Sequence, residues 1–107
     1  MRILVLGAGG TGGYFGGRLA QAGVDVTFLV RPARAAELAT NGLRLRSPLG
    51  DASVPVRCLT ADALAADAAQ APYDLVVLSC KAYDLDSAIA AIAPAMGAET
   101  AVLPILN

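Results

Sequence analysis

Six residues near the N-terminus have a spacing that suits the binding of a phosphorylated ligand. The sequence Gly7-Ala8-Gly9-Gly10-Thr11-Gly12 has the pattern G-x-G-x-x-G and directly follows the apolar run 2–6, which is typical of a strand. In this position the first glycine allows a sharp turn, the second leaves room for a pyrophosphate, and the third lets the next helix pack closely on the sheet. The free N–H groups at the helix start attract phosphate charge. The motif therefore predicts a dinucleotide site at residues 7–12.

A second position, about 20 residues after the motif, selects the nucleotide in sites of this kind. An Asp or Glu after the second strand binds the ribose 2′-hydroxyl of NAD, whereas an arginine accommodates the 2′-phosphate of NADP. Here the strand ends in Val30-Arg31, and no acidic residue lies between Asp25 and Glu37. Arg31 therefore favours NADPH, and Arg34 is a candidate for a second phosphate contact. The alternative for either arginine is an exposed charge at the start of a helix.

Two more polar residues follow later strands. Lys81, the only lysine, comes directly after the apolar run 75–80, and Asn107 comes after the run 100–106. Since ligands of open parallel sheets bind beyond the carboxyl ends of the strands, both residues are candidates for contact with a cofactor or substrate. A solvated charge is the alternative for Lys81. We expect Tyr14 and Tyr83 to be packing residues and not proton donors.

The composition argues against several other kinds of protein. The chain has no histidine, and Cys58 and Cys80 lack a metal-binding spacing, so we predict no metal site and no nucleophilic triad at Ser79 or Cys80. We expect reduced, half-buried thiols in a cytoplasmic protein. A net charge of −1 argues against nucleic-acid binding. The apolar stretch before the glycines is too short for a signal peptide. No apolar run reaches the ~18 residues of a membrane span.

The elements that would hold these residues alternate along the chain. With 107 residues, 56% of them hydrophobic, we expect one α/β domain over 1–107 with a Rossmann-type, doubly wound, mainly parallel sheet. In the strand 25–30, Val26, Phe28 and Val30 should share one face and Leu29 the other. The expected strands are 2–6, 25–30, 75–80 and 100–106, and the expected helices are 11–22, 33–40, 62–69 and 84–93.

Three details of these elements can be predicted. Residues 43–46 and 54–56 look like a hairpin and not like another strand–helix unit. Pro104 removes a donor from its strand and therefore fits an edge position. In the helix 84–93 the side chains of Leu85, Ala88, Ile89 and Ile92 have helical spacing and should form its packed face.

Together these segments resemble the N-terminal NADP-binding domain of the ketopantoate reductase (2-dehydropantoate 2-reductase) family. The resemblance covers the whole chain and rests on segments 7–12, 30–31, 42–45, 47–51, 80–84 and 103–107. The lysine-alanine-tyrosine sequence at 81–83 is the most distinctive of them. Gly10, where alanine is common in the family, and Leu106, where a polar residue is frequent, are departures.

The resemblance implies NADPH-dependent reduction of 2-dehydropantoate, a 2-oxo acid, in pantothenate and coenzyme A synthesis. It implies that Arg31 binds the 2′-phosphate and that Lys81 and Asn107 line the nicotinamide and substrate end. The family's general-acid lysine lies in a C-terminal helical domain beyond these 107 residues. We therefore expect the chain alone to be inactive.

Two alternatives stay open at this point. One is a free-standing, non-catalytic NADP-binding or sensing module, and the other is a different two-domain dehydrogenase with a similar first half. The sequence that follows Asn107 would separate the first alternative from the enzyme. As a fragment of a larger protein, the chain should expose apolar surface at its truncated edge, so we expect self-association, with a homodimer as one form, or poor solubility.

Overall fold

The computed structural model describes residues 1–106, with only the backbone of Ala82 and Leu106. Five strands form a sheet in the order β5-β2-β1-β6-β7, and every neighbouring pair is parallel. The chain first builds the sheet outward from β1 on one side, and then returns to build it on the other side. The prediction of a doubly wound, parallel sheet is confirmed. The strands are β1 (Arg2–Leu6), β2 (Asp25–Leu29), β5 (Arg57–Leu59), β6 (Leu75–Cys80) and β7 (Ala101–Leu106).

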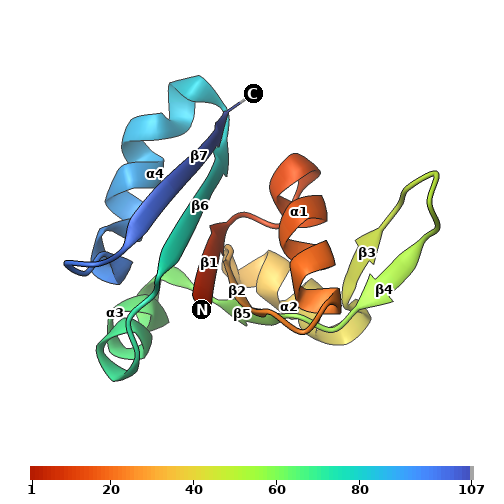
Figure 1. Ribbon diagram of the computed structural model, residues 1–107, viewed down its shortest axis with the longest axis horizontal. Helices are drawn as coiled ribbons and strands as arrows, with labels where there is room; N and C mark the ends of the chain where they lie inside the picture. Colours follow the sequence, from red (N-terminus) through yellow and green to blue (C-terminus); the bar gives the residue numbers. More distant parts are fainter. Residues whose placement is uncertain (107) are drawn as a thin grey trace.

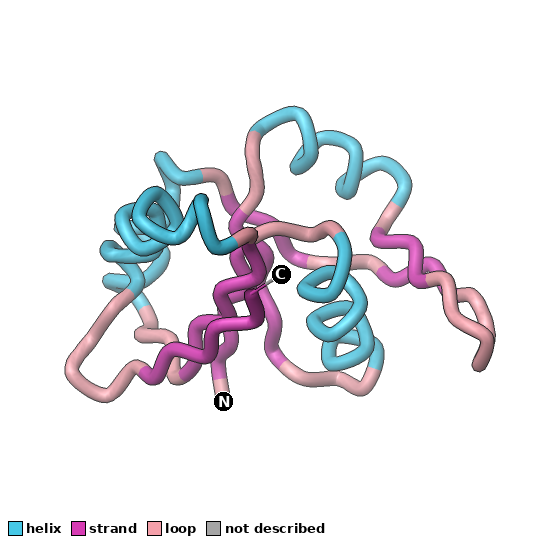
Figure 2. The backbone as a smooth tube through the Cα atoms, turned by 90° about the horizontal axis from the view of Figure 1, so that it is seen from above, coloured by secondary structure: helices cyan, strands magenta, loops and turns pink. Residues whose placement is uncertain are grey.

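Helices cover both faces of the sheet (Figures 1 and 2). Phe28 and Val30 pack with Leu38 of α2 on one face, whereas Leu29 packs with Leu64 of α3 on the other. The predicted division of the second strand between two faces is therefore confirmed. The helices are α1 (Gly10–Gln21), α2 (Pro32–Asn41), α3 (Ala61–Gln70) and α4 (Leu85–Ile92), with 3₁₀ turns η1 (Ala82–Asp84) and η2 (Ala93–Ala95). No helix within residues 1–106 has the length and apolar character needed to cross a bilayer.

Glycines let α1 lie close to its neighbours. A Cβ atom at Gly16 would lie 2.8 Å from Cζ of Phe28, and one at Gly17 would lie 2.6 Å from Cδ2 of Leu45. Leu45 belongs to a separate antiparallel hairpin of β3 (Leu43–Leu45) and β4 (Ala52–Val54), which projects from the body of the molecule (Figure 1). The helix α1 thus packs on the sheet at Gly16 and on the hairpin at Gly17, and so it connects the two.

One strand was not expected from the sequence. The predicted hairpin exists, but its second strand is Ala52–Val54 and not 54–56. The chain then enters the main sheet as β5, parallel to β2, and continues into α3. A strand of three residues is too short to show an alternating pattern, and it exists because the exposed edge of β2 supplies its hydrogen-bond partners. The prediction of a hairpin between residues 43 and 56 is therefore confirmed, and the strand–helix unit of β5 and α3 begins after it.

The C-terminal half gives one confirmed detail and two corrections. β7 is an edge strand, as Pro104 predicts, since only β6 pairs with it. In α4 the side chains of Ala88 and Ile92 are buried, but Ile89 is 50% exposed, so it does not belong to the packed face. Tyr83 is 80% exposed and Tyr14 is 40% exposed, so neither is buried as a packing residue would be.

Candidate dinucleotide-binding site

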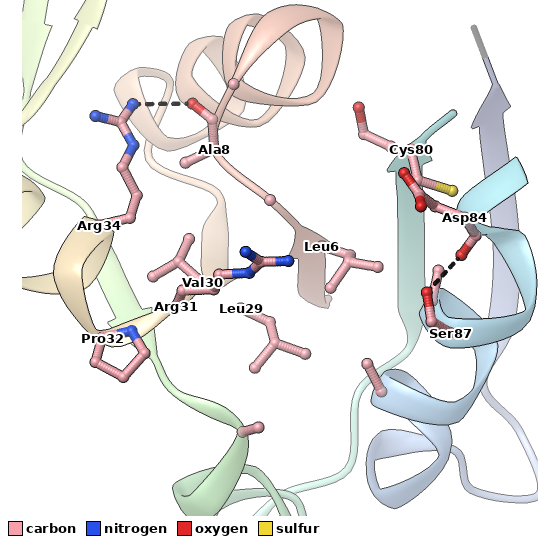
Figure 3. Close-up of a pocket in the computed structure, with 16 residues that line it drawn as sticks. Leu6, Ala8, Leu29, Val30, Arg31, Pro32, Arg34, Cys80, Asp84 and Ser87 are labelled. Atoms are coloured by element: carbon pink, nitrogen blue, oxygen red, sulfur yellow. Dashed lines mark hydrogen bonds between the residues drawn. The ribbon is translucent and has the colours of Figure 1, made fainter. Parts of the chain in front are cut away.

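A cleft of about 610 Å³ opens beyond the carboxyl ends of β1, β2 and β6. We call it the main cleft. It lies where the two halves of the sheet diverge, which is where ligands bind in open parallel sheets. Figure 3 shows Arg31 and Arg34 on its α2 side and Asp84 and Ser87 on its α4 side. Its lining includes Leu6, Gly7, Ala8, Gly9, Leu29, Val30, Arg31, Pro32, Arg34, Ala61, Ser79, Cys80, Asp84, Ser87, Ala88 and Ala91.

The glycine turn forms the centre of the main cleft. Gly7 leaves β1 with φ +86°, and its N–H donates to the carbonyl oxygen of Leu29 at 2.9 Å. A positive φ of this kind is accessible to glycine at little cost. At Gly9 a Cβ atom would meet no heavy atom within 4 Å. The chain itself therefore does not fill the space beside Gly9, as the approach of a ligand to the backbone requires.

The N-terminus of α1 is open to an anion. Gly9 is its N-cap and provides no capping side chain, and the first turn contains no acidic residue. The first N–H groups of a helix have no acceptor within the helix, so they can bind a phosphate instead. Gly12 has a different role, because a Cβ atom there would lie 2.4 Å from Cβ of Ser79 on β6. Glycine at position 12 is therefore needed for the contact between helix and sheet.

Arg31 stands at the mouth of the main cleft. It is the N-cap of α2, followed by Pro32 at the start of the helix, and its side chain is exposed. Within residues 1–106 no hydrogen bond or ion pair involves its guanidinium group. An unpaired guanidinium at the end of β2 can bind a phosphate with two parallel hydrogen bonds.

Arg34 differs from Arg31 because its guanidinium group already has partners within the chain. Its Nη2 donates to the carbonyl oxygen of Ala8 at 3.2 Å (Figure 3). Its Nη1 lies 2.7 Å from Oε1 of Glu37. Ala8 belongs to the glycine turn and is buried. The first of these bonds therefore ties α2 to the turn, a contact that the sequence did not predict.

Several predicted site residues lie outside the lining of the main cleft. Gly10 borders a smaller cavity of about 230 Å³ next to the hairpin, and Thr11 is exposed on α1. Lys81 is exposed just after β6, with its Nζ 5.9 Å from the centre of the Tyr83 ring. β6 and β7 end side by side, since Cys80 pairs with Leu106. Asn107, the other residue predicted for the substrate end, lies outside the described residues.

The two cysteines are free and half-buried. Burial raises the pKa of the Cys58 thiol, against a smaller opposing effect of Arg34. A raised pKa keeps the thiol protonated and unreactive. Among residues 1–106 no group of three metal-ligating side chains comes together.

The match to known sequences decides the family. The sequence model described as ketopantoate reductase PanE/ApbA matches residues 3–107. The chain belongs to the ketopantoate reductase family. It is 40% identical over 107 residues to the uncharacterized oxidoreductase YkpB of Bacillus subtilis. It is 38% identical over 109 residues to the 2-dehydropantoate 2-reductase of Mesorhizobium japonicum.

Solved structures of a ketopantoate reductase and of a D-mandelate dehydrogenase have the same fold. The PanE/ApbA family ketopantoate reductase from Ralstonia eutropha superimposes with a TM-score of 0.84 at 34% identity, over 100% of this chain and 34% of that one. D-mandelate dehydrogenase, solved with NADH and anilino(oxo)acetate, gives a TM-score of 0.84 at 25% identity, over 100% of this chain and 33% of that one.

The match covers only part of each relative. The chain aligns over its whole length but spans 33% of the Bacillus protein and 32% of the Mesorhizobium protein. The 107 residues thus correspond to about a third of a ketopantoate reductase. The remaining two-thirds of those relatives have no counterpart in this sequence.

The residues that line the main cleft from α4 were not predicted from the sequence. Asp84, Ser87, Ala88 and Ala91 line the cleft from α4. Their spacing of three, four and seven residues from Asp84 is that of one helix face. That spacing was visible in the sequence, but the larger apolar side chains of the same helix suggested a different face.

Proposed function

We propose that this chain is the NADPH-binding part of an oxidoreductase that reduces 2-dehydropantoate, or a similar 2-oxo acid, to the 2-hydroxy acid. Family membership supports the reaction class, and the names of the relatives support the substrate. The choice of NADPH depends on residues of this chain, because one structural relative was solved with NADH. The observation that carries it is Arg31 at the end of β2, whose guanidinium group has no partner within residues 1–106, together with the lack of any acidic residue between Asp25 and Glu37.

The residues of the main cleft fit a dinucleotide. The open space at Gly9 and the uncapped N-terminus of α1 suit a pyrophosphate. Arg31 would bind the 2′-phosphate, and Arg34 would hold the turn in place through Ala8. When bound, NADPH supplies a hydride for the carbonyl carbon of the substrate.

The substrate end would lie at the carboxyl ends of β6 and β7. The ammonium group of Lys81 and the amide of Asn107 would orient the carboxylate and the carbonyl group of the 2-oxo acid. A proton donor for the developing alkoxide would come from the part of the protein that matches the remaining two-thirds of the relatives. We therefore expect the 107 residues to bind NADPH without turning over substrate.

The first prediction concerns Arg31 and is tested by calorimetric titration with NADPH and NADH. Arg31→Ala should weaken NADPH binding by roughly 1–3 kcal/mol and leave NADH binding nearly unchanged, because only NADPH carries the 2′-phosphate. Arg18→Ala is the matched control, since Arg18 lies in the last turn of α1, away from the main cleft. Equal losses for both nucleotides in Arg31→Ala would show that Arg31 does not bind the 2′-phosphate.

A further experiment tests whether the proton donor lies outside these 107 residues. The reading frame after codon 107 should encode a helical domain that carries a lysine in an apolar cleft. The complete product should then oxidise NADPH in the presence of 2-dehydropantoate or another member of a panel of 2-oxo acids. A stop codon at that point would instead support a non-catalytic NADP-binding module.

A further inference from the structure

The N-cap of α4 has an acidic side chain that does not cap its helix. Asp84 precedes Leu85 at the start of α4, where an aspartate usually accepts hydrogen bonds from the next N–H groups. Here the Asp84 carboxylate makes no such bond, and the residue is exposed on the wall of the main cleft. Within residues 1–106 no hydrogen bond or ion pair involves this carboxylate. It is therefore free to accept a hydrogen bond from a ligand.

Ser87 adds a second acceptor beside it. The hydroxyl of Ser87 donates to the main-chain carbonyl oxygen of Asp84 at 3.0 Å (Figure 3). Its hydrogen is thus used within the helix start, and the lone pairs of its oxygen remain. This wall of the cleft offers hydrogen-bond acceptors together with a negative charge. Its ligand must be a donor, and a phosphate would be repelled.

The surface next to these two acceptors consists of small apolar side chains. Ala88 and Ala91 continue the same face of α4, and Ala61 and Pro32 line the cleft from the starts of α3 and α2. Small side chains of this kind leave a slot for a flat ring, whereas a ribose would require more polar partners along its edge. A planar ring with an amino group at its edge fits both the slot and the acceptors.

We infer that Asp84 and Ser87 recognise the exocyclic amino group of adenine and thereby select adenine dinucleotides over their hypoxanthine analogues. The inference rests on the proposed function, since adenine enters the site as part of NADPH. Hypoxanthine carries a carbonyl oxygen in place of the amino group. That exchange brings an acceptor against the Asp84 carboxylate, which costs the hydrogen bond and adds repulsion.

The test compares two ligands whose bases differ in the group at C6, amino or carbonyl, and in the proton that hypoxanthine carries on N1. The chain is titrated by calorimetry with NADPH and with reduced nicotinamide hypoxanthine dinucleotide phosphate. The wild-type chain should bind NADPH more tightly by about tenfold or more, the effect of a lost charge-assisted hydrogen bond. Equal affinities for the two ligands would overturn the inference but leave the proposed function intact. A failure to bind NADPH at all would overturn the proposed function, and with it the inference.

A pair of variants then assigns the discrimination to one side chain. Asp84→Asn should bring the ratio of the two affinities close to one, because an amide can donate to the carbonyl group as well as accept from the amino group. Asp86→Asn, which removes an exposed charge from the same first turn of α4, should keep the wild-type ratio. Retention of the wild-type ratio in Asp84→Asn would exclude Asp84 as the residue that reads the base.

Discussion

Two glycines of the N-terminal turn have different neighbours in the structure, which agrees with the different roles that the motif gives them. A Cβ atom at Gly9 would meet nothing within 4 Å, whereas one at Gly12 would overlap Ser79 of β6. Gly9 has φ −108°, a conformation that any residue can adopt. The fold therefore needs glycine at position 12, and only a bound ligand needs it at position 9.

This contrast predicts opposite effects of two matched substitutions. Gly9→Ala should change the free energy of unfolding by less than about 0.5 kcal/mol and strongly weaken binding of both NADPH and NADH, because its methyl group occupies ligand space. Gly12→Ala should destabilise the chain by about 1–3 kcal/mol through overpacking. Urea unfolding and nucleotide titration measure the two effects. Wild-type affinity in Gly9→Ala would show that no pyrophosphate approaches the backbone at this residue.

Arg34 leads to another prediction at the scale of a residue. Arg34→Ala removes the hydrogen bond to Ala8, so it should weaken NADPH and NADH by the same factor, about fivefold for one hydrogen bond. Glu37→Gln, which alters only the other partner of Arg34, is the control. A loss restricted to NADPH would instead identify Arg34 as a contact of the 2′-phosphate.

At the scale of elements, one partly buried carboxylate joins α3 to the sheet. Oδ2 of Asp67 accepts from the hydroxyl of Tyr73 at 2.6 Å and from Nη2 of Arg2 at 2.9 Å, and Oδ1 is bonded to Arg57 at the start of β5. Burial acts to raise the pKa of Asp67. The hydrogen bonds from Arg57, Tyr73 and Arg2 outweigh burial and lower the pKa from 3.8 to about 2. The short strand β5 is thus held in place by the ion pair between Arg57 and Asp67 as well as by its hydrogen bonds with β2.

This lowered pKa predicts how stability depends on pH. The contribution of Asp67 should be complete above its unfolded pKa of 3.8 and disappear as the pH falls toward its folded pKa of about 2. The stabilisation lost over that range is on the order of 2 kcal/mol. Urea unfolding between these pH values should show this loss in the wild type and in Asp86→Asn, but not in Asp67→Asn. An identical pH dependence in all three would contradict the prediction.

For the molecule as a whole, β7 is the exposed feature of greatest consequence. It forms an edge of the sheet, and its side chains Val102 and Leu103 are 40% and 42% exposed. They point to opposite faces, because neighbouring residues of a strand alternate. Ile105 of the same strand packs against the core, but Val102 and Leu103 leave apolar surface exposed at the edge of the sheet, and such an edge favours association.

We therefore expect the 107-residue chain to associate with itself. Light scattering should show a mean mass that rises with concentration. The rise should be smaller in Val102→Lys/Leu103→Lys, because two charges on the edge oppose pairing. The exposed pair Ala65→Lys/Ala66→Lys on α3 is a control for added charge. A constant monomer mass at high concentration would contradict the prediction.

Much of the architecture was predictable because long apolar segments have few alternatives. The run 75–80 is buried on both faces, and the alternation in 25–30 matches its two packed faces. The hairpin boundary and β5 were not predictable in the same way. Both depend on hydrogen-bond partners from distant segments, which three-residue strands do not reveal in their own sequence.

The same division holds for the site. The local sequence determined the strand–turn–helix at residues 2–21 and the arginine that follows β2, because turn geometry and strand ends are set by neighbouring residues. Only the tertiary structure decided that Arg34 bonds to Ala8, that Gly12 contacts Ser79 and that Asp84 lines the cleft. Each of these contacts joins residues of different strand–helix units, and their distance is set by how those units pack on the sheet.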